Sequence, residues 1–124
     1  MPSKSSDPVR IRQRLLDMLG SINRIQDYTA GMGLAAFLAD QKTIDACVRN
    51  IEIIGEASRH VPADLAALYT RAPWRVIGDL RNKVIHEYDG IDPARIYQTI
   101  TDELPDLKSA LFRMLDACPD PAAD

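Results

Sequence analysis

The sequence has few of the residues from which disulfide frameworks and metal sites are built. Its 124 residues include two cysteines and two histidines. Cys47 lies within an apolar helical pattern and Cys118 lies in a proline-rich tail, so we expect neither a disulfide framework nor a cysteine metal site. HExxH, CxxC and Asp-rich ligand loops are also absent from the sequence. We therefore expect no metal and no other cofactor.

Long apolar runs and a strong basic excess are also missing. No apolar stretch approaches the roughly 20 residues that span a bilayer, and the first residues lack an apolar signal core. We expect a cytoplasmic protein without membrane contact. The net charge is −3 and is unevenly distributed. Residues 1–88 contain 12 Lys/Arg and 10 Asp/Glu, whereas residues 89–124 contain 3 Lys/Arg and 8 Asp/Glu. Because this is not the basic stripe of a protein that coats nucleic acid, any nucleic-acid contact must be local or assisted by a partner.

Apolar residues recur at steps of three and four along most of the chain, and no segment alternates with period two. This pattern predicts helices. Asp7, Asp40 and Asp92 are expected as N-caps, and Pro105 is expected to kink or split the last helix. The expected helices run from residue 8 to 28, from 40 to about 61, over a short piece at 63–70, from 73 to a stop at 88–90, and from 92 to about 115.

The helical pattern indicates an all-α fold, an antiparallel helical bundle of four main helices plus a short extra helix. We expect a single domain over residues 1–124, with an ordered core of about 8–116 and a flexible tail at 117–124. Gly55 falls inside the second long helix, where glycine costs about 1 kcal/mol relative to alanine. Such a glycine usually marks the close packing of another backbone.

The segment from Arg81 to Tyr88 holds the residue types from which metal-free RNA cleavage can be built. A guanidinium can hold a phosphate with its planar fork of donors, and an imidazole can move protons near neutral pH. Asn82 and Glu56 are candidates for lining the cleft, although helix-surface roles also suit both. Taken alone, Arg81 could equally be a solvated residue and His86 a helix-end residue that suits the helix dipole.

Arg81 and His86 do not share one face of a helix. Five residues correspond to about 140° around the axis and about 7.5 Å along it. A site within one chain would need the helix to fray near His86. Alternatively, two copies of the helix meet across a two-fold axis, and both chains line one cleft. In that cleft, two histidines could act as base and acid in a single transfer.

Residues 81–88 match R-x4-6-H-x-Y, and the sequence resembles the HepT-like toxin branch of the HEPN superfamily. The resemblance covers roughly residues 8–116. It is supported by further segments that occur in the family's order: residues 54–57 (I-G-E-A), 73–82 (P-W-x-x-I-x-x-x-R-N), 89–92 and 104–107. The ordered set is far more specific than the Arg–His spacing alone.

The resemblance implies a HEPN helical bundle that dimerises through its motif helices. It implies a metal-independent endoribonuclease that acts as the toxin of a type II toxin–antitoxin system. In this family pattern, Arg81 and His86 would carry catalysis, and Asn82 would be the polar residue that commonly follows the arginine. The implied partner is an MntA-like minimal nucleotidyltransferase antitoxin, which can transfer AMP to Tyr88. A second hypothesis remains open: a HEPN dimer that binds a nucleotide or a partner and cuts nothing.

Overall fold

The computed structural model describes residues 7–86 and 91–118, and for residues 84–86 it describes the backbone alone. These ranges contain seven helices and no strand, which confirms the all-α prediction. The helices are α1 (Pro8–Tyr28), α2 (Leu34–Leu38), α3 (Gln41–Ser58), α4 (Ala63–Ala66), α5 (Trp74–His86), α6 (Pro93–Asp102) and α7 (Leu104–Ala117). The expected stop at residues 88–90 lies outside the described residues, as do residues 119–124 of the tail that was expected to be flexible at 117–124. Of that tail, Ala117 ends α7 and Cys118 caps it.

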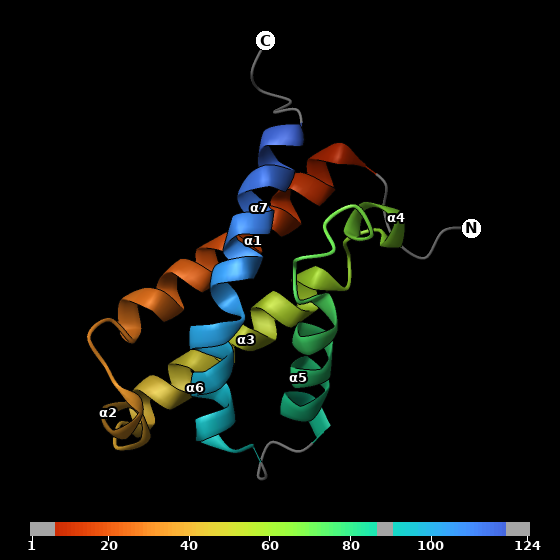
Figure 1. The fold of residues 1–124 in the computed structure, drawn as a ribbon. Coiled ribbons are helices and arrows are strands. Elements are labelled where there is room, and N and C mark those ends of the chain that lie inside the picture. The colour runs from red at the N-terminus through yellow and green to blue at the C-terminus, as the bar shows by residue number, and fades with distance from the viewer. Residues whose placement is uncertain (1–6, 87–90, 119–124) are drawn as a thin grey trace.

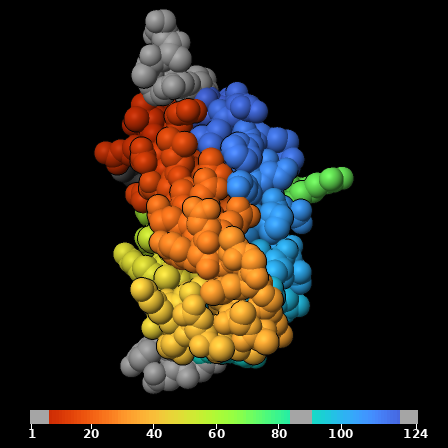
Figure 2. Space-filling view, turned by 90° about the vertical axis from the view of Figure 1, so that its left-hand side faces the viewer, coloured from red at the N-terminus to blue at the C-terminus, as the bar shows by residue number. Residues whose placement is uncertain are grey.

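The helix α3 lies at the centre of the bundle, between α1 and α5 (Figure 1). The helices α6 and α7 follow one another as a nearly continuous column, in which α7 packs against α1 and α6 packs against α2 and α3. Figure 2 shows α1 and α7 side by side on one face of the molecule, with the α2–α3 region below them. No helix of the described ranges has both the length and the apolar character needed to cross a membrane.

The three predicted N-caps are confirmed by their hydrogen bonds. The side chains of Asp7, Asp40 and Asp92 accept from backbone N–H groups in the first turns of α1, α3 and α6, at 3.0, 3.1 and 3.0 Å. These bonds satisfy donors that a helix start leaves without intrahelical partners. The predicted split at Pro105 is also confirmed, since α6 ends at Asp102 and α7 begins at Leu104 with the proline in its first turn.

The sequence reading missed the short helix α2. No helix was expected between the first two long helices, but Leu34–Leu38 forms a separate helix that ends before Asp40. Five residues are too few for a helical repeat to show in a pattern of apolar residues. The helix buries Phe37 completely and packs against α3 and α6.

The core is formed by apolar side chains from every helix except α4, and the predicted stripes supply most of them. Leucine, isoleucine and methionine dominate it, and the fully buried large side chains are Phe37, Leu15, Met18, Ile22, Ile25, Ile51, Ile54, Ile77, Ile96, Leu104, Leu107 and Leu111. Cys47 is also fully buried, and burial raises the pKa of its thiol to about 11. It therefore acts as a small apolar residue, as its position in the pattern predicted.

Candidate active site

The side chain of Arg81 extends from α5 across the surface of α3 and lies directly on Gly55. A Cβ atom added to Gly55 would lie 2.5 Å from Cβ, 2.7 Å from Cγ and 2.9 Å from Cδ of Arg81. Real Cβ atoms do not approach other atoms so closely. The expectation of close packing at Gly55 is thus met by the methylene stem of an arginine and not by a backbone. Only glycine leaves room for Arg81 in this position.

The guanidinium of Arg81 is partly satisfied by two neighbours. Its Nη1 donates to Oδ1 of Asn82 at 3.1 Å, and its Nη2 lies 3.5 Å from Oε2 of Glu56. The side chain is 17% exposed. Its Nε is buried and is the one buried side-chain polar atom, among the described residues, that lacks a hydrogen-bond partner. Because buried donors are nearly always paired, Arg81 retains unused capacity to bind an acceptor.

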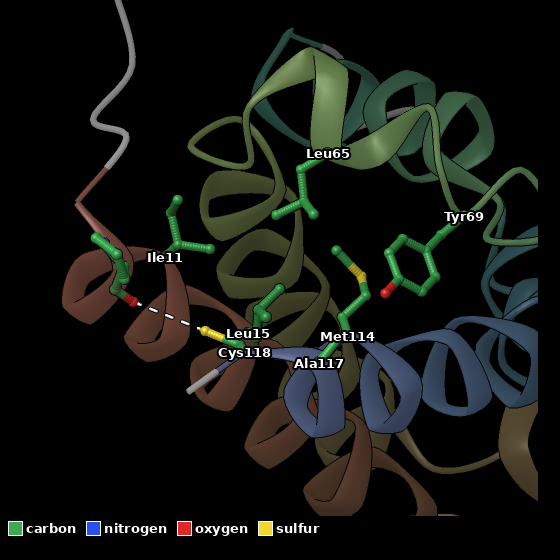
Figure 3. Close-up of a pocket in the computed structure, with 8 residues that line it drawn as sticks. Ile11, Leu15, Leu65, Tyr69, Met114, Ala117 and Cys118 are labelled. Atoms are coloured by element: carbon green, nitrogen blue, oxygen red, sulfur yellow. Dashed lines mark hydrogen bonds between the residues drawn. The ribbon is translucent and has the colours of Figure 1, made fainter. Parts of the chain in front are cut away.

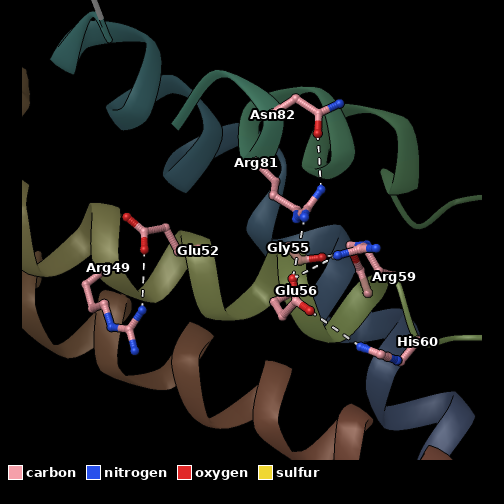
Figure 4. Close-up of polar contacts among 9 residues, drawn as sticks. Arg49, Glu52, Gly55, Glu56, Arg59, His60, Arg81 and Asn82 are labelled. Atoms are coloured by element: carbon pink, nitrogen blue, oxygen red, sulfur yellow. Dashed lines mark hydrogen bonds and ion pairs between the residues drawn. The ribbon is translucent and has the colours of Figure 1, made fainter. Parts of the chain in front are cut away.

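The carboxylate of Glu56 contacts basic side chains from two helical segments, the end of α3 and α5 (Figure 4). Its Oε2 lies 3.3 Å from Nη1 of Arg59 and 3.5 Å from Arg81, and its Oε1 lies 3.5 Å from Nε2 of His60. Burial raises the pKa of Glu56, but Arg59, His60 and Arg81 outweigh this effect and bring the pKa below its ordinary value. The carboxylate is therefore ionised at neutral pH and is still half exposed to solvent.

The helix α5 keeps its helical backbone through His86. On a regular helix, Arg81 and His86 are about 140° apart around the axis and about 7.5 Å apart along it. The fraying near His86 that a site within one chain would need is therefore absent from the described backbone. The side chain of His86 and the whole of Tyr88 lie outside the described residues.

Two hollows adjoin the polar cluster. Asn82 lines one of about 300 Å³ between α5 and α6, together with Asp79, Leu80, Lys83 and Arg95. Glu56 lines another of about 180 Å³, together with Arg14, Asp17, Arg49, Glu52, Ile53 and Ala57. Both cleft-lining candidates thus border open space. Among the described side chains, those of residues 7–83 and 91–118, no three of His, Cys, Asp or Glu gather in a group that could hold a metal ion.

A third hollow, of about 150 Å³, is apolar in character (Figure 3). It lies between α1, α7 and the α4 segment, and its lining is Pro8, Ile11, Leu15, Leu65, Tyr69, Met114, Ala117 and Cys118. The Cys118 thiol closes one side by donating to the Pro8 carbonyl at 3.9 Å. None of the residues of the Arg81 cluster belongs to it, and it offers no charged group for phosphate chemistry.

Residues 18–114 match the family model described as Ribonuclease HepT-like. This range includes Gly55, Glu56 and the whole segment from Arg81 to Tyr88. The chain belongs to the ribonuclease HepT-like family. The resemblance stated from the motifs is thereby confirmed.

Two relatives show how much of this HepT-like chain is shared with other proteins. A probable ribonuclease HepT of Thermococcus cleftensis is 38% identical over 100 residues, which cover 81% of this chain and 91% of the relative. A candidate RNase of Methanocaldococcus jannaschii is 36% identical over 105 residues, which cover 85% of this chain and 83% of the relative. The similarity therefore extends over nearly the full length of both relatives. No solved structure matches the chain.

The sequence reading of this HepT-like protein missed Arg59 and His60 as members of the site. A signal for both was present in the sequence, because Arg59 and His60 follow Glu56 by three and four residues. These are the spacings at which helical side chains meet.

Proposed function

We propose that this HepT-like protein is a metal-independent endoribonuclease and the toxin of a type II toxin–antitoxin system. Membership of a ribonuclease family is the main support. The observation that points to a particular site is Arg81, whose methylene stem is held on Gly55 by close packing and whose guanidinium retains an unpaired buried donor. A preorganised donor of this kind can stabilise charge that develops on a phosphoryl oxygen.

In the proposed reaction, the 2′-hydroxyl of a ribose attacks the adjacent phosphorus. One neutral imidazole of His86 removes the hydroxyl proton, and Arg81 stabilises the negative charge on the non-bridging oxygens. A protonated imidazole gives its proton to the departing 5′-oxygen. The new bond joins the 2′-oxygen to phosphorus, and the broken bond joins phosphorus to the 5′-oxygen. The products are therefore a 2′,3′-cyclic phosphate and a 5′-hydroxyl.

We further propose that the protein acts as a homodimer in which the α5 helices of two chains meet. The support is geometric. A regular α5 keeps Arg81 and His86 on different faces of one helix. Two such helices related by a two-fold axis can bring both residue pairs into one cleft. Two imidazoles then serve as base and acid without a change of protonation between steps.

The proposed test of the activity uses two substrates that differ in one group. The purified protein with excess EDTA is expected to cleave a single-stranded RNA. It should leave the 2′-O-methyl oligonucleotide of the same sequence intact, because the methyl group removes the attacking hydroxyl. Gel electrophoresis of labelled strands gives both results. Cleavage of both strands, or of neither, would overturn the proposed chemistry, and cleavage of neither would favour a binding module that cuts nothing.

The proposed regulator is an MntA-like nucleotidyltransferase antitoxin that transfers AMP from ATP to Tyr88. The phenolic oxygen would attack the α-phosphorus, lose its proton and displace pyrophosphate. Tyr88 is two residues beyond His86, so the anionic adduct would be close to the phosphate site and would compete with RNA. This proposal rests on the family resemblance of residues 81–88.

Co-expression with such a nucleotidyltransferase is expected to add the mass of one AMP per chain, whereas the Tyr88→Phe variant should stay unmodified. Intact-mass spectrometry measures both. Tyr28→Phe is the control, since Tyr28 is a half-exposed tyrosine at the end of α1. If Tyr88→Phe gained the same mass, or if no chain were modified, the proposed control by AMP transfer would be wrong.

A further inference from the structure

The cluster around Glu56 holds more positive than negative charge. One carboxylate faces the guanidinium groups of Arg59 and Arg81 and the imidazole of His60. The next ion pair along α3 is different, because Arg49 and Glu52 pair one to one at 3.3 Å. In a protein of net charge −3, a local surplus of cations on one surface is a feature that an anionic ligand would recognise.

Glu56 does not bind any of its three partners tightly. All three contacts lie between 3.3 and 3.5 Å, beyond the usual 2.7–2.9 Å of a charge-assisted hydrogen bond. The carboxylate is also 51% exposed, so it can turn into solvent without leaving the helix surface. When it does so, Arg59, His60 and Nη2 of Arg81 all become available to another acceptor.

The positions of Arg59, His60 and Arg81 suit a chain of phosphates. Because Arg59 and Arg81 contact the same carboxylate oxygen, their terminal nitrogens lie within two hydrogen-bond lengths of each other. Arg59 caps the end of α3 and His60 follows it, close to where the chain enters α4. The helix α5 starts beside α4, where Trp74 Nε1 donates to the Ala66 carbonyl at 3.2 Å, and it ends at His86. Along α5, Arg81 therefore lies between the end of the helix that begins beside α4 and the end at His86.

From these contacts we infer that Arg59 and His60 form a second phosphate subsite, which binds the RNA phosphate next to the one held by Arg81. The Glu56 carboxylate occupies this place in the free protein, and the incoming phosphate displaces it. This inference rests on the proposed function and adds to it the recognition of a neighbouring nucleotide. Arginine provides the planar fork that fits a phosphate, and the imidazole adds a single donor.

The experiment measures binding without cleavage, by fluorescence anisotropy with labelled 2′-O-methyl oligonucleotides. A dinucleotide has one phosphate between its sugars, and a tetranucleotide has three. The Arg59→Ala/His60→Ala double variant is expected to bind the tetranucleotide about tenfold more weakly than the unchanged protein does. Its affinity for the dinucleotide should be unchanged. The salt dependence of tetranucleotide binding should fall by about 0.7 in slope per lost phosphate contact.

Two further variants separate a subsite from a structural or diffuse charge effect. Arg49→Ala removes an arginine with the same kind of ion pair from the same helix and should bind the tetranucleotide normally. Glu56→Gln removes the competing charge and should bind it at least as tightly as the unchanged protein does. If Arg59 and His60 only held Glu56 and Arg81 in place, Glu56→Gln would weaken binding.

The outcomes also separate this inference from the proposed function. Three results would overturn the second subsite and leave the proposed cleavage at Arg81 untouched. The double variant could bind the tetranucleotide as tightly as the unchanged protein, Arg49→Ala could weaken binding as much as the double variant does, or Glu56→Gln could weaken binding. If the unchanged protein bound neither oligonucleotide and did not cleave RNA, the proposed function itself would fail.

Discussion

Alanine at Arg81 or at His86 is expected to slow RNA cleavage by about 10²- to 10⁴-fold, the range typical for a general acid–base or a preorganised electrostatic group. Arg81→Ala removes the donors for the phosphoryl oxygens, and His86→Ala removes the proton carrier. Both side chains are on the last turns of α5, and the core stripe of that helix is retained. The measurement is the initial rate of cleavage of a labelled RNA, with helical content checked by circular dichroism.

The matched control for this loss is Arg113→Ala. Arg113 is an exposed arginine on α7 whose hydrogen bond goes to Ser109 of the same helix. Its removal changes the net charge by the same amount as Arg81→Ala, and the rate should stay within about twofold of the unchanged protein, as expected of a surface substitution. Equal rates for all four proteins would mean that Arg81 and His86 have no part in the chemistry.

Mixed dimers extend the same experiment to the shared cleft. A dimer of one unchanged and one His86→Ala chain, purified through two different tags, is expected to keep less than about a tenth of the activity, because base and acid come from different chains. Two independent sites would instead retain half of the activity. A result near one half would contradict a cleft that uses both imidazoles.

Gly55→Ala is expected to lower the cleavage rate by about 100-fold although it adds only one methyl group, because a misplacement of about 1 Å in a catalytic group has an effect of this size. The new Cβ would overlap the stem of Arg81 from Cβ to Cδ, so α5 must shift or the guanidinium must move away from Asn82 and Glu56. Overpacking of this kind typically costs 1–3 kcal/mol of stability. Urea unfolding and the cleavage rate of the folded protein measure the two effects separately.

Gly20→Ala is the control, since a Cβ on Gly20 of α1 would make only an ordinary contact, 3.6 Å from Nη1 of Arg24. Alanine is the better helix former by about 1 kcal/mol, so Gly20→Ala should match or exceed the unchanged protein in stability and should cleave RNA at the same rate. If folded Gly55→Ala were as active as Gly20→Ala, Gly55 would not position Arg81.

The helices of this protein could be predicted from its sequence because their signals are local. Asp7, Asp40 and Asp92 each precede a run of apolar residues with helical spacing, and each caps the helix expected of it. Pro105 lacks the backbone donor that a continuous helix needs, and the chain separates α6 from α7 just before it. These features depend on neighbours within a few residues, so the sequence alone contains them.

The contacts between helices could not be predicted in the same way. The position of Gly55 inside a helix indicated close packing, but only the crossing of α3 and α5 identifies Arg81 as the group that packs there. Arg59 and His60 became members of the site for the same reason, since Glu56 links them to an arginine 25 residues further along the chain. The helix α2 was missed because five residues are too short for a repeat.

The chemical ends of the RNA fragments test the central claim most directly. With the unchanged protein in excess EDTA, the account predicts fragments that carry a 2′,3′-cyclic phosphate and a 5′-hydroxyl, because the ribose hydroxyl is the nucleophile and His86 supplies and removes the protons. Mass spectrometry of a short RNA identifies these ends. Fragments with a 3′-hydroxyl and a 5′-phosphate, or the loss of cleavage in EDTA, would contradict it.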